Sequence, residues 1–196
     1  MNKADLDRIF PRKYWLAEAE VPWLYRKAGQ AREYIVEIGA AYGSSATVFL
    51  LGKRPGVRVV SIDAFVEDPV SHWRASAAEC RAAVEQAAGD LVADWTLIPR
   101  PSAEVAPTWG SPIGLLYVDG DHSYEGVRQD FECWSPWLLP GASVIFHDSR
   151  RDPDADPRVF ARGWPGPTRL VEEVAGSGAF EILDTCFSMT EMRHTK

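Results

Sequence analysis

Residues 115–131, LLYVDGDHSYEGVRQDF, give the clearest indication of how this chain folds. Its apolar first part ends abruptly in DGDH, residues 119–122. Leaving ionisable groups buried and unpaired costs free energy, so the apolar part predicts a buried strand and DGDH predicts the loop that follows it. In α/β enzymes, loops at strand ends carry the chemistry. The stretch therefore predicts both a strand and a functional site at its end.

A second apolar run, ASVIF at residues 142–146, ends in the same way at His147 and Asp148. Further short apolar runs, separated by helical patterns, occupy residues 34–39, 57–63, 95–99 and 113–119. Such alternation predicts a doubly wound α/β fold, with a mostly parallel sheet and helices on both faces. Right-handed crossovers place the carboxyl ends of these strands at one edge, where the ligand crevice lies. The residues expected at that edge are Asp63, Asp119, His147 and Asp148.

Helical patterns separate and flank the expected strands. Residues 1–30 predict one or two short helices that cap the domain, and residues 149–167 are rich in Pro, Asp, Arg and Gly, which predicts a long loop. Residues 180–192 predict an antiparallel hairpin at the sheet edge. The other expected helices are at 44–53, 71–89, 124–137 and 168–176.

Composition narrows the class of protein. The chain has 196 residues, 46% of them hydrophobic, which fits one domain spanning residues 1–196 with a sizeable core. A formal net charge of −7 argues against nucleic acid as a partner. The longest apolar runs predict no membrane span and no signal peptide. The three cysteines are far apart and fit no zinc motif, which favours a cytoplasmic protein with reduced thiols.

The segment VEIGAAYGSS, residues 36–45, links the first expected strand to a helix. Gly39 and Gly43 allow a sharp turn and a close approach to a ligand. Asp63 ends the next strand, where an acid can bind ribose hydroxyls. A dinucleotide-binding turn would need glycine in place of Ala41 and Ser44, so this looser turn suits a nucleoside without phosphates, such as S-adenosylmethionine. The alternative is that Gly39 serves only the tight turn.

At these motifs the chain resembles the class I S-adenosylmethionine-dependent methyltransferases. VEIGAAYGSS and VVSID look like the first two motifs of that family, and YVDGDHSYEGVRQDFECW and LLPGASVIFHDS resemble its macrocin O-methyltransferase and cephalosporin hydroxylase-like subgroup. The resemblance covers roughly residues 30–190. It implies a Rossmann-like sheet of seven strands with one antiparallel edge strand.

The resemblance also implies which residues contact the cofactor. Glu37, Gly39, Tyr42, Gly43 and Asp63 belong to the first two motifs. Ser102 follows the third strand, where methyltransferases contact adenine, and Asp119 ends the fourth. His72 and Trp73 could border adenine or could simply start a helix.

Relatives similar to catechol O-methyltransferase bind magnesium at the two strand ends. The matching ligands here are Asp119, His147 and Asp148. His147 stands where an acid is common, and imidazole is a poorer ligand than carboxylate for magnesium, so Mg²⁺ and Mn²⁺ both stay open as the cation.

Two residues compete for the role of catalytic base. His122 titrates near neutrality without help and matches the position of a catalytic lysine in the catechol subgroup. Asp121 matches the base of some sugar O-methyltransferases. Either residue could instead serve the start of the following helix, as Ser123 also could.

The resemblance implies an O-methyltransferase acting on a hydroxyl of a small molecule, such as a sugar, a phenol or another natural product. Residues 149–167, with Trp164, could close over this acceptor, and Trp15, Trp23 and Tyr25 could form the opposite wall. Self-association is a further expectation. The alternatives are a nucleotide-dependent oxidoreductase and a non-catalytic cofactor-binding protein on a methyltransferase scaffold.

Overall fold

The computed structural model describes residues 1–12, 14–67, 74–150 and 164–195, which contain one seven-stranded sheet. The strand order is β3-β2-β1-β4-β5-β7-β6, and the pairs from β3 to β5 are parallel. The expected doubly wound, mostly parallel fold is confirmed. The strands are β1 (Tyr34–Ile38), β2 (Arg58–Ile62), β3 (Trp95–Ile98), β4 (Ile113–Val118), β5 (Leu138–Phe146), β6 (Phe180–Cys186) and β7 (Met189–His194).

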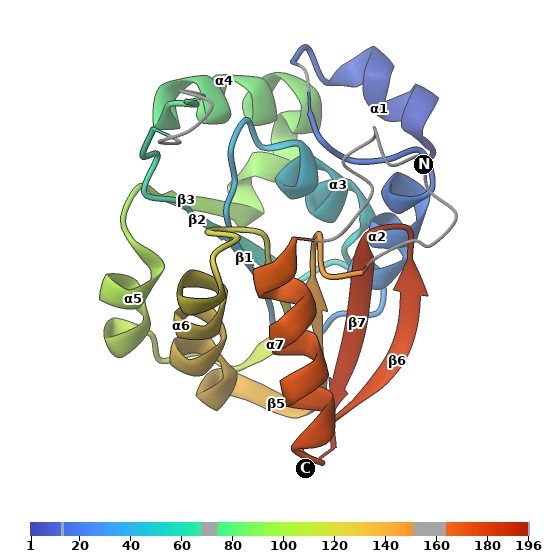
Figure 1. The fold of residues 1–196 in the computed structure, drawn as a ribbon. Helices are drawn as coiled ribbons and strands as arrows, with labels where there is room; N and C mark the ends of the chain where they lie inside the picture. The colour runs from blue at the N-terminus through green and yellow to red at the C-terminus, as the bar shows by residue number, and fades with distance from the viewer. Residues whose placement is uncertain (13, 68–73, 151–163, 196) are drawn as a thin grey trace.

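Helices cover both faces of the sheet (Figure 1). One face packs on α1 to α4, through a core that includes Leu24, Phe49 and Val84. The other packs on α5 to α7, through a core that includes Phe131 and Leu170. The helices are α1 (Lys3–Ile9), α2 (Glu20–Ala28), α3 (Ser44–Gly52), α4 (Ala77–Ala88), α5 (Ser102–Val105), α6 (Tyr124–Trp134) and α7 (Pro165–Gly176), with 3₁₀ turns η1 (Gly89–Asp94), η2 (Ala106–Thr108) and η3 (Ser135–Trp137).

The reversed strand of the sheet is β7, which pairs antiparallel with both β5 and β6. The hairpin expected at residues 180–192 is present, but its second strand is the inner one. The strand at the edge of the sheet is therefore β6, which runs in the same direction as β5.

Two element boundaries differ from those expected. β5 begins at Leu138, four residues before the expected apolar run, and its register with β4 shifts between Ile113 and Leu115. α7 begins at Pro165, within the expected loop. Gly166 makes this early start possible, since a Cβ at this position would overlap the backbone of residues 122–124.

Gly39, the residue after β1, packs against the backbone of Asp119, the residue after β4. Its φ is +89°, and an added Cβ would overlap the carbonyl oxygen of Asp119. Gly56 has a nearly equal φ of +85° but has nothing within 4 Å of an added Cβ. The two glycines share the left-handed conformation and differ only in packing.

We predict that Gly56→Ala costs about 1–2 kcal/mol of unfolding free energy, the strain of the left-handed conformation. Gly39→Ala should cost about 2–5 kcal/mol, since overpacking adds to the same strain. Urea denaturation followed by circular dichroism measures both. Equal losses in the two variants would contradict the proposed contact between Gly39 and Asp119.

Candidate active site

The carboxyl ends of the parallel strands are aligned in register. Ile38 pairs with Val118, and Val118 pairs with Phe146. The pattern continues one residue further, because Asp119 N–H donates to Ile38 O (2.8 Å) and His147 N–H donates to Val118 O (3.1 Å). Asp119 and His147 therefore leave the sheet side by side.

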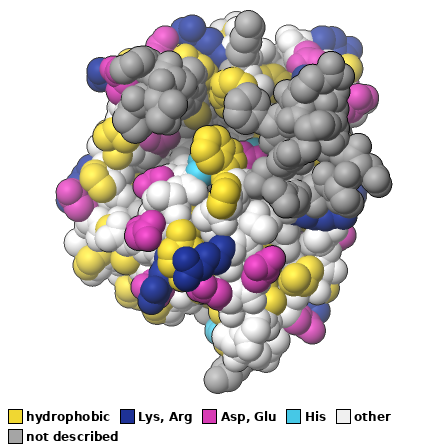
Figure 2. Space-filling model, viewed as in Figure 1, with side chains coloured by type: hydrophobic (Ala, Val, Ile, Leu, Met, Phe, Trp, Pro, Cys, Tyr) yellow, Lys and Arg dark blue, Asp and Glu magenta, His cyan; other side chains and the backbone are white. Residues whose placement is uncertain are grey.

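Four side chains converge at this edge: Asp119, His122, His147 and Asp148. One potential ligand atom from each lies within 4.8 Å of the others. His147 Nδ1 is 3.0 Å from Asp119 Oδ1, and His122 Nε2 is 3.3 Å from Asp148 Oδ2. In Figure 2, histidine and acidic side chains are partly visible near the upper ends of α6 and α7. We call these four residues the acid–imidazole cluster.

Charges inside the cluster shift its protonation equilibria. Burial by itself lowers the pKa of His147, but Asp119, Asp148 and Glu20 outweigh burial and raise this pKa well above its usual value. Burial also lowers the pKa of His122, and Asp148 and Asp119 again reverse the effect. Burial alone would raise the pKa of Asp148, but the two imidazoles lower it. The two imidazoles therefore hold the Asp148 carboxylate ionised at neutral pH.

The donor set of the cluster fits a divalent cation. His122 Nε2 is buried and has no aligned hydrogen-bond partner among the described residues, although two carboxylates lie nearby. Two carboxylates and two imidazoles suit Mn²⁺, Fe²⁺ or Zn²⁺, and the carboxylates also suit Mg²⁺. Asp119, His147 and Asp148, expected as metal ligands, lie together, and His122 adds a fourth potential donor.

Asp121 lies in the same loop, but its carboxylate turns toward α6. Its Oδ1 accepts a hydrogen bond from Ser123 N–H (2.8 Å) and its Oδ2 accepts one from Ser123 Oγ (2.9 Å). Ser123 in turn caps α6 by accepting from Gly126 N–H (3.0 Å). Between the two residues expected to compete as the base, His122 faces the acid–imidazole cluster and Asp121 supports a helix start.

The turn after β1 lies directly beside this cluster, through the Gly39–Asp119 contact. Gly39 and Gly43 both have positive φ, and so does Ala41, at 48°, which is uncommon for a residue with a side chain. Gly43 is also required by packing, because a Cβ there would overlap Val84 on α4. Packing alone thus explains both glycines, and their role in cofactor binding stays a prediction.

Asp63, expected to bind ribose, holds this turn in the structure. Its Oδ2 accepts hydrogen bonds from Ala40 N–H (2.9 Å) and Ala41 N–H (2.8 Å), and its Oδ1 accepts from Phe65 N–H (2.6 Å). These bonds compensate the strained backbone at Ala41. A contact with ribose would have to add to these bonds or replace one of them.

Glu37 is fully buried between the turn and β2. Its Oε2 accepts a hydrogen bond from Ser61 Oγ (2.5 Å), which itself accepts one from Trp95 Nε1 (2.9 Å). Its Oε1 has no partner among the described residues. Burial raises the pKa of Glu37 to about 8, and the nearby charges of Asp119 and Asp63 add to the shift.

Ser102 and Tyr42 are the remaining residues expected near the cofactor. Ser102, the first residue of α5, hydrogen-bonds Asp130. Asp130 is buried, and burial raises its pKa to about 6. Tyr42 is half-buried and its hydroxyl donates to Arg74 O (3.4 Å).

Trp164 lies beside the cluster. Its backbone N–H donates to Asp148 O (2.6 Å), and the centroid of its ring is 5.2 Å from that of the His122 ring. The Trp164 side chain is partly open to solvent, with 44% of the residue exposed. Of the three residues expected to form the opposite wall, Trp23 is buried in the core, Tyr25 packs against the core, and Trp15 is 73% exposed. Their role as a wall stays a prediction. Residues 151–163 of the expected loop, and His72 and Trp73, lie outside the described residues.

Glu20 is a site residue that sequence reasoning missed. It begins α2, is 1% exposed, and its Oε2 lies 3.5 Å from His147 Nε2. The contact spans more than 120 residues, and the sequence around Glu20 carries no motif that indicates it.

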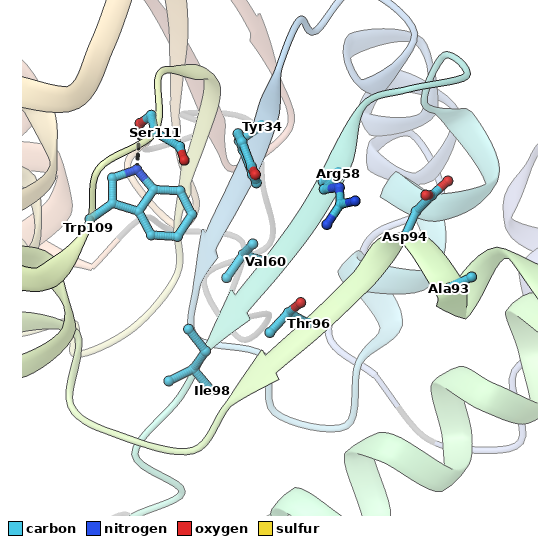
Figure 3. Close-up of a pocket in the computed structure, with 9 residues that line it drawn as sticks. All are labelled: Tyr34, Arg58, Val60, Ala93, Asp94, Thr96, Ile98, Trp109 and Ser111. Carbon is cyan, nitrogen blue, oxygen red and sulfur yellow. Dashed lines mark hydrogen bonds between the residues drawn. The ribbon is translucent and has the colours of Figure 1, made fainter.

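A separate hollow of about 210 Å³ lies over β1, β2 and β3. Figure 3 shows Tyr34, Trp109 and Arg58 around it. It is lined by none of the cluster residues and none of the turn after β1. Asp94, on its rim, is already paired with Lys53 (2.6 Å).

Comparison with known proteins assigns the chain to a family. A methyltransferase-domain family model matches residues 36–149, more than half of the chain, so the chain belongs to this methyltransferase family. The match contains the turn after β1, Asp63 and all four cluster residues. The expected class, an S-adenosylmethionine-dependent methyltransferase of class I, is confirmed, and the narrower subgroup stays a prediction.

Solved structures share the fold. The O-methyltransferase TomG from Streptomyces achromogenes superposes with a TM-score of 0.69 at 19% identity, covering 100% of this chain and 92% of TomG. An O-methyltransferase from Bacillus cereus gives 0.68 at 19% identity, with the same coverage. The calicheamicin methyltransferase CalS11 gives 0.64 at 19% identity, covering 89% of this chain and 77% of CalS11.

A curated relative matches only locally. An uncharacterized protein, y4gI, of Sinorhizobium fredii is 51% identical over 39 residues, which are 20% of this chain and 4% of that protein. None of the helices in the described part of the chain is long and apolar enough to cross a bilayer.

We predict that Glu37 makes stability depend on pH. Its raised pKa means that the folded state holds a proton that the unfolded state has lost, so its stabilising contribution is complete below about pH 4.5 and is lost as the pH rises through about 8. Glu37→Gln should flatten this part of the curve, as urea denaturation across that range would show. Parallel curves for the two proteins would contradict the buried, protonated carboxyl.

Proposed function

We propose that the protein is an O-methyltransferase that transfers the methyl group of S-adenosylmethionine to a hydroxyl of a small molecule, with a divalent cation at the acid–imidazole cluster. The observation that carries this proposal is the packing of Gly39 against Asp119. It puts the turn of the methyltransferase family next to four potential metal ligands. The methyl donor and the acceptor hydroxyl would therefore meet at the carboxyl ends of β1, β4 and β5.

The turn and its neighbours would hold the cofactor. Glu37, Gly39, Tyr42, Gly43, Asp63, Ser102 and Asp119 remain the residues proposed for this role. Support comes from solved relatives, since the TomG structure contains S-adenosylmethionine and the Bacillus cereus structure contains its demethylated product.

Asp119, His147 and Asp148 would hold the cation, with Mg²⁺ and Mn²⁺ as the candidates. When bound, a divalent cation lowers the pKa of an acceptor hydroxyl and orients it. The sulfonium is already a good leaving group, so the protein's main tasks are alignment and deprotonation. The carboxyl ends of the strands supply alignment, because backbone hydrogen bonds to Ile38 and Val118 fix Asp119 and His147.

His122 is the base that the geometry favours. Its Nε2 faces the cluster, whereas both oxygens of Asp121 bind Ser123. In this structure the pKa of His122 is raised by its carboxylate neighbours, once the opposing effect of burial is overcome. Neutralising those carboxylates with a cation would lower this pKa toward the range of a general base.

The acceptor is proposed to be a small hydroxylated compound such as a sugar, a phenol or another natural product. Trp164 offers an exposed aromatic face beside His122, on which a planar or sugar ring could stack. TomG is involved in tomaymycin synthesis, and CalS11 is a calicheamicin methyltransferase, so related folds serve natural-product pathways. Cytoplasmic location, self-association and the lack of a nucleic-acid partner remain part of the proposal.

The test is a methyl-transfer assay with S-adenosylmethionine and a panel of hydroxylated acceptors, with Mg²⁺ or Mn²⁺ and with a chelator. Turnover that needs the cation supports the proposal. Tight binding of the cofactor without turnover on any acceptor would favour the alternative of a non-catalytic protein. The family match argues against the alternative of an oxidoreductase.

We predict that Asp119→Asn removes cation-dependent turnover, because a neutral amide replaces a ligand carboxylate. Affinity for S-adenosylhomocysteine, measured by calorimetry, should fall less than turnover, since the contact with Gly39 is made by the backbone carbonyl of residue 119 and is kept in the variant. Equal losses of turnover and of cofactor affinity would show that the two sites are not separate.

A paired comparison assigns the base. His122→Gln should lower kcat by about 10²–10⁴-fold, the usual contribution of a general base, and should remove its ionisation from the pH profile. Asp121→Asn should lower stability more than kcat, because it weakens the bonds to Ser123. The reverse result would identify Asp121 as the base.

A further inference from the structure

Glu20 is held in a fixed position by the protein around it. Its Oε1 accepts hydrogen bonds from Ser188 Oγ (2.6 Å) and Ser188 N–H (3.2 Å). Its Oε2 accepts one from Ala17 N–H (2.7 Å). Each carboxylate oxygen of Glu20 accepts a hydrogen bond from a backbone N–H, so this position favours a carboxylate over an amide. An amide in either orientation would point its NH₂ group at one of these donors.

His147 lies between this carboxylate and the cluster. Glu20 Oε2 is 3.5 Å from Nε2, on one side of the ring, and Asp119 Oδ1 is 3.0 Å from Nδ1, on the other. The ring is 4% exposed, so it has no access to other partners through solvent. Nε2 has no aligned hydrogen bond among the described residues. The Glu20 carboxylate is the acceptor that lies within reach of a proton on Nε2.

We propose that Glu20 is a positioning residue: when a cation takes the place of the proton on Nδ1 of His147, Glu20 keeps the remaining ring proton on Nε2, so that the Nδ1 lone pair faces the cation in the cluster. This inference rests on the proposed function. A histidine that binds a metal usually donates its other ring N–H to a carboxylate or a carbonyl, which fixes the ring and strengthens the ligand. Here that carboxylate comes from α2, outside the segment that matches the family model.

The proposal differs from a purely structural role for Glu20. A structural role would require only that Ser188 and Ala17 keep their acceptor, and it would leave the chemistry of the His147 ring unchanged. A positioning role requires that cation affinity and the protonated ring nitrogen both depend on Glu20.

The experiment compares wild type with Glu20→Gln in the full-length protein. Mn²⁺ affinity is measured by electron paramagnetic resonance, and the ring ¹⁵N shifts of His147 are measured in the Mg²⁺-loaded protein. We expect Glu20→Gln to bind Mn²⁺ about 10–100-fold more weakly, as is usual when the partner of a metal-bound histidine is lost. We also expect the signature of a proton on Nε2 in wild type to weaken in the variant.

Glu191→Gln is the matched control. Glu191 is also 1% exposed, on β7, but its carboxylate pairs with Lys27 (2.6 Å) and Ser143 (2.6 Å). This variant should bind Mn²⁺ as wild type does, which separates loss of a buried charge from loss of the His147 contact. Circular dichroism of both variants checks that they fold.

Two results would overturn the inference. One is equal Mn²⁺ affinity in wild type and Glu20→Gln, and the other is a wild-type His147 ring protonated on Nδ1 with Mg²⁺ present. Failure of the proposed function has a different signature, namely no binding of S-adenosylhomocysteine to wild type by calorimetry. A wild type that binds S-adenosylhomocysteine but no Mn²⁺ would refute the cation and this inference together, and would leave the methyltransferase assignment intact.

Discussion

The site depends above all on the parallel register of β1, β4 and β5. Because Ile38, Val118 and Phe146 lie side by side, the residues that follow them leave the sheet together. A shift of one residue in either pairing would turn each side chain to the opposite face. The register is protected by the buried apolar residues of these strands and by the contact of Gly39 with Asp119, which fits only when the two strand ends are level.

The same alignment concentrates charge at one end of the molecule. Glu37, Asp63, Asp119 and Asp148 lie within a few residues of strand ends, and Glu20 approaches from α2. Their mutual repulsion is visible in the raised pKa of Glu37, to which Asp119 and Asp63 contribute after burial. Two imidazoles offset part of this charge. A bound cation would offset more of it, which supports the proposed cation at this site.

The sequence allowed the strands to be predicted, because short apolar runs in a parallel sheet carry a clear pattern. It also placed Asp119, His147 and Asp148 together, since strand ends follow directly from strand order. It did not reveal the burial of Asp130, whose partner Ser102 is distant in the chain. It could not reveal Glu20, because the contact with His147 depends on how α2 docks. The orientations of Asp121 and His122 were equally hidden, since they are set by side-chain packing in one loop.

The hydrogen bonds between Glu20 and Ser188 join residues 168 positions apart, close to the two ends of the described chain. During translation, β5 and the residues of the family motif emerge well before the β6–β7 hairpin that carries Ser188. A nascent chain can therefore form most of the parallel sheet while Glu20 still lacks Ser188, which donates hydrogen bonds to it. Completion of the site therefore has to wait until β7 has been synthesised and has paired with β5.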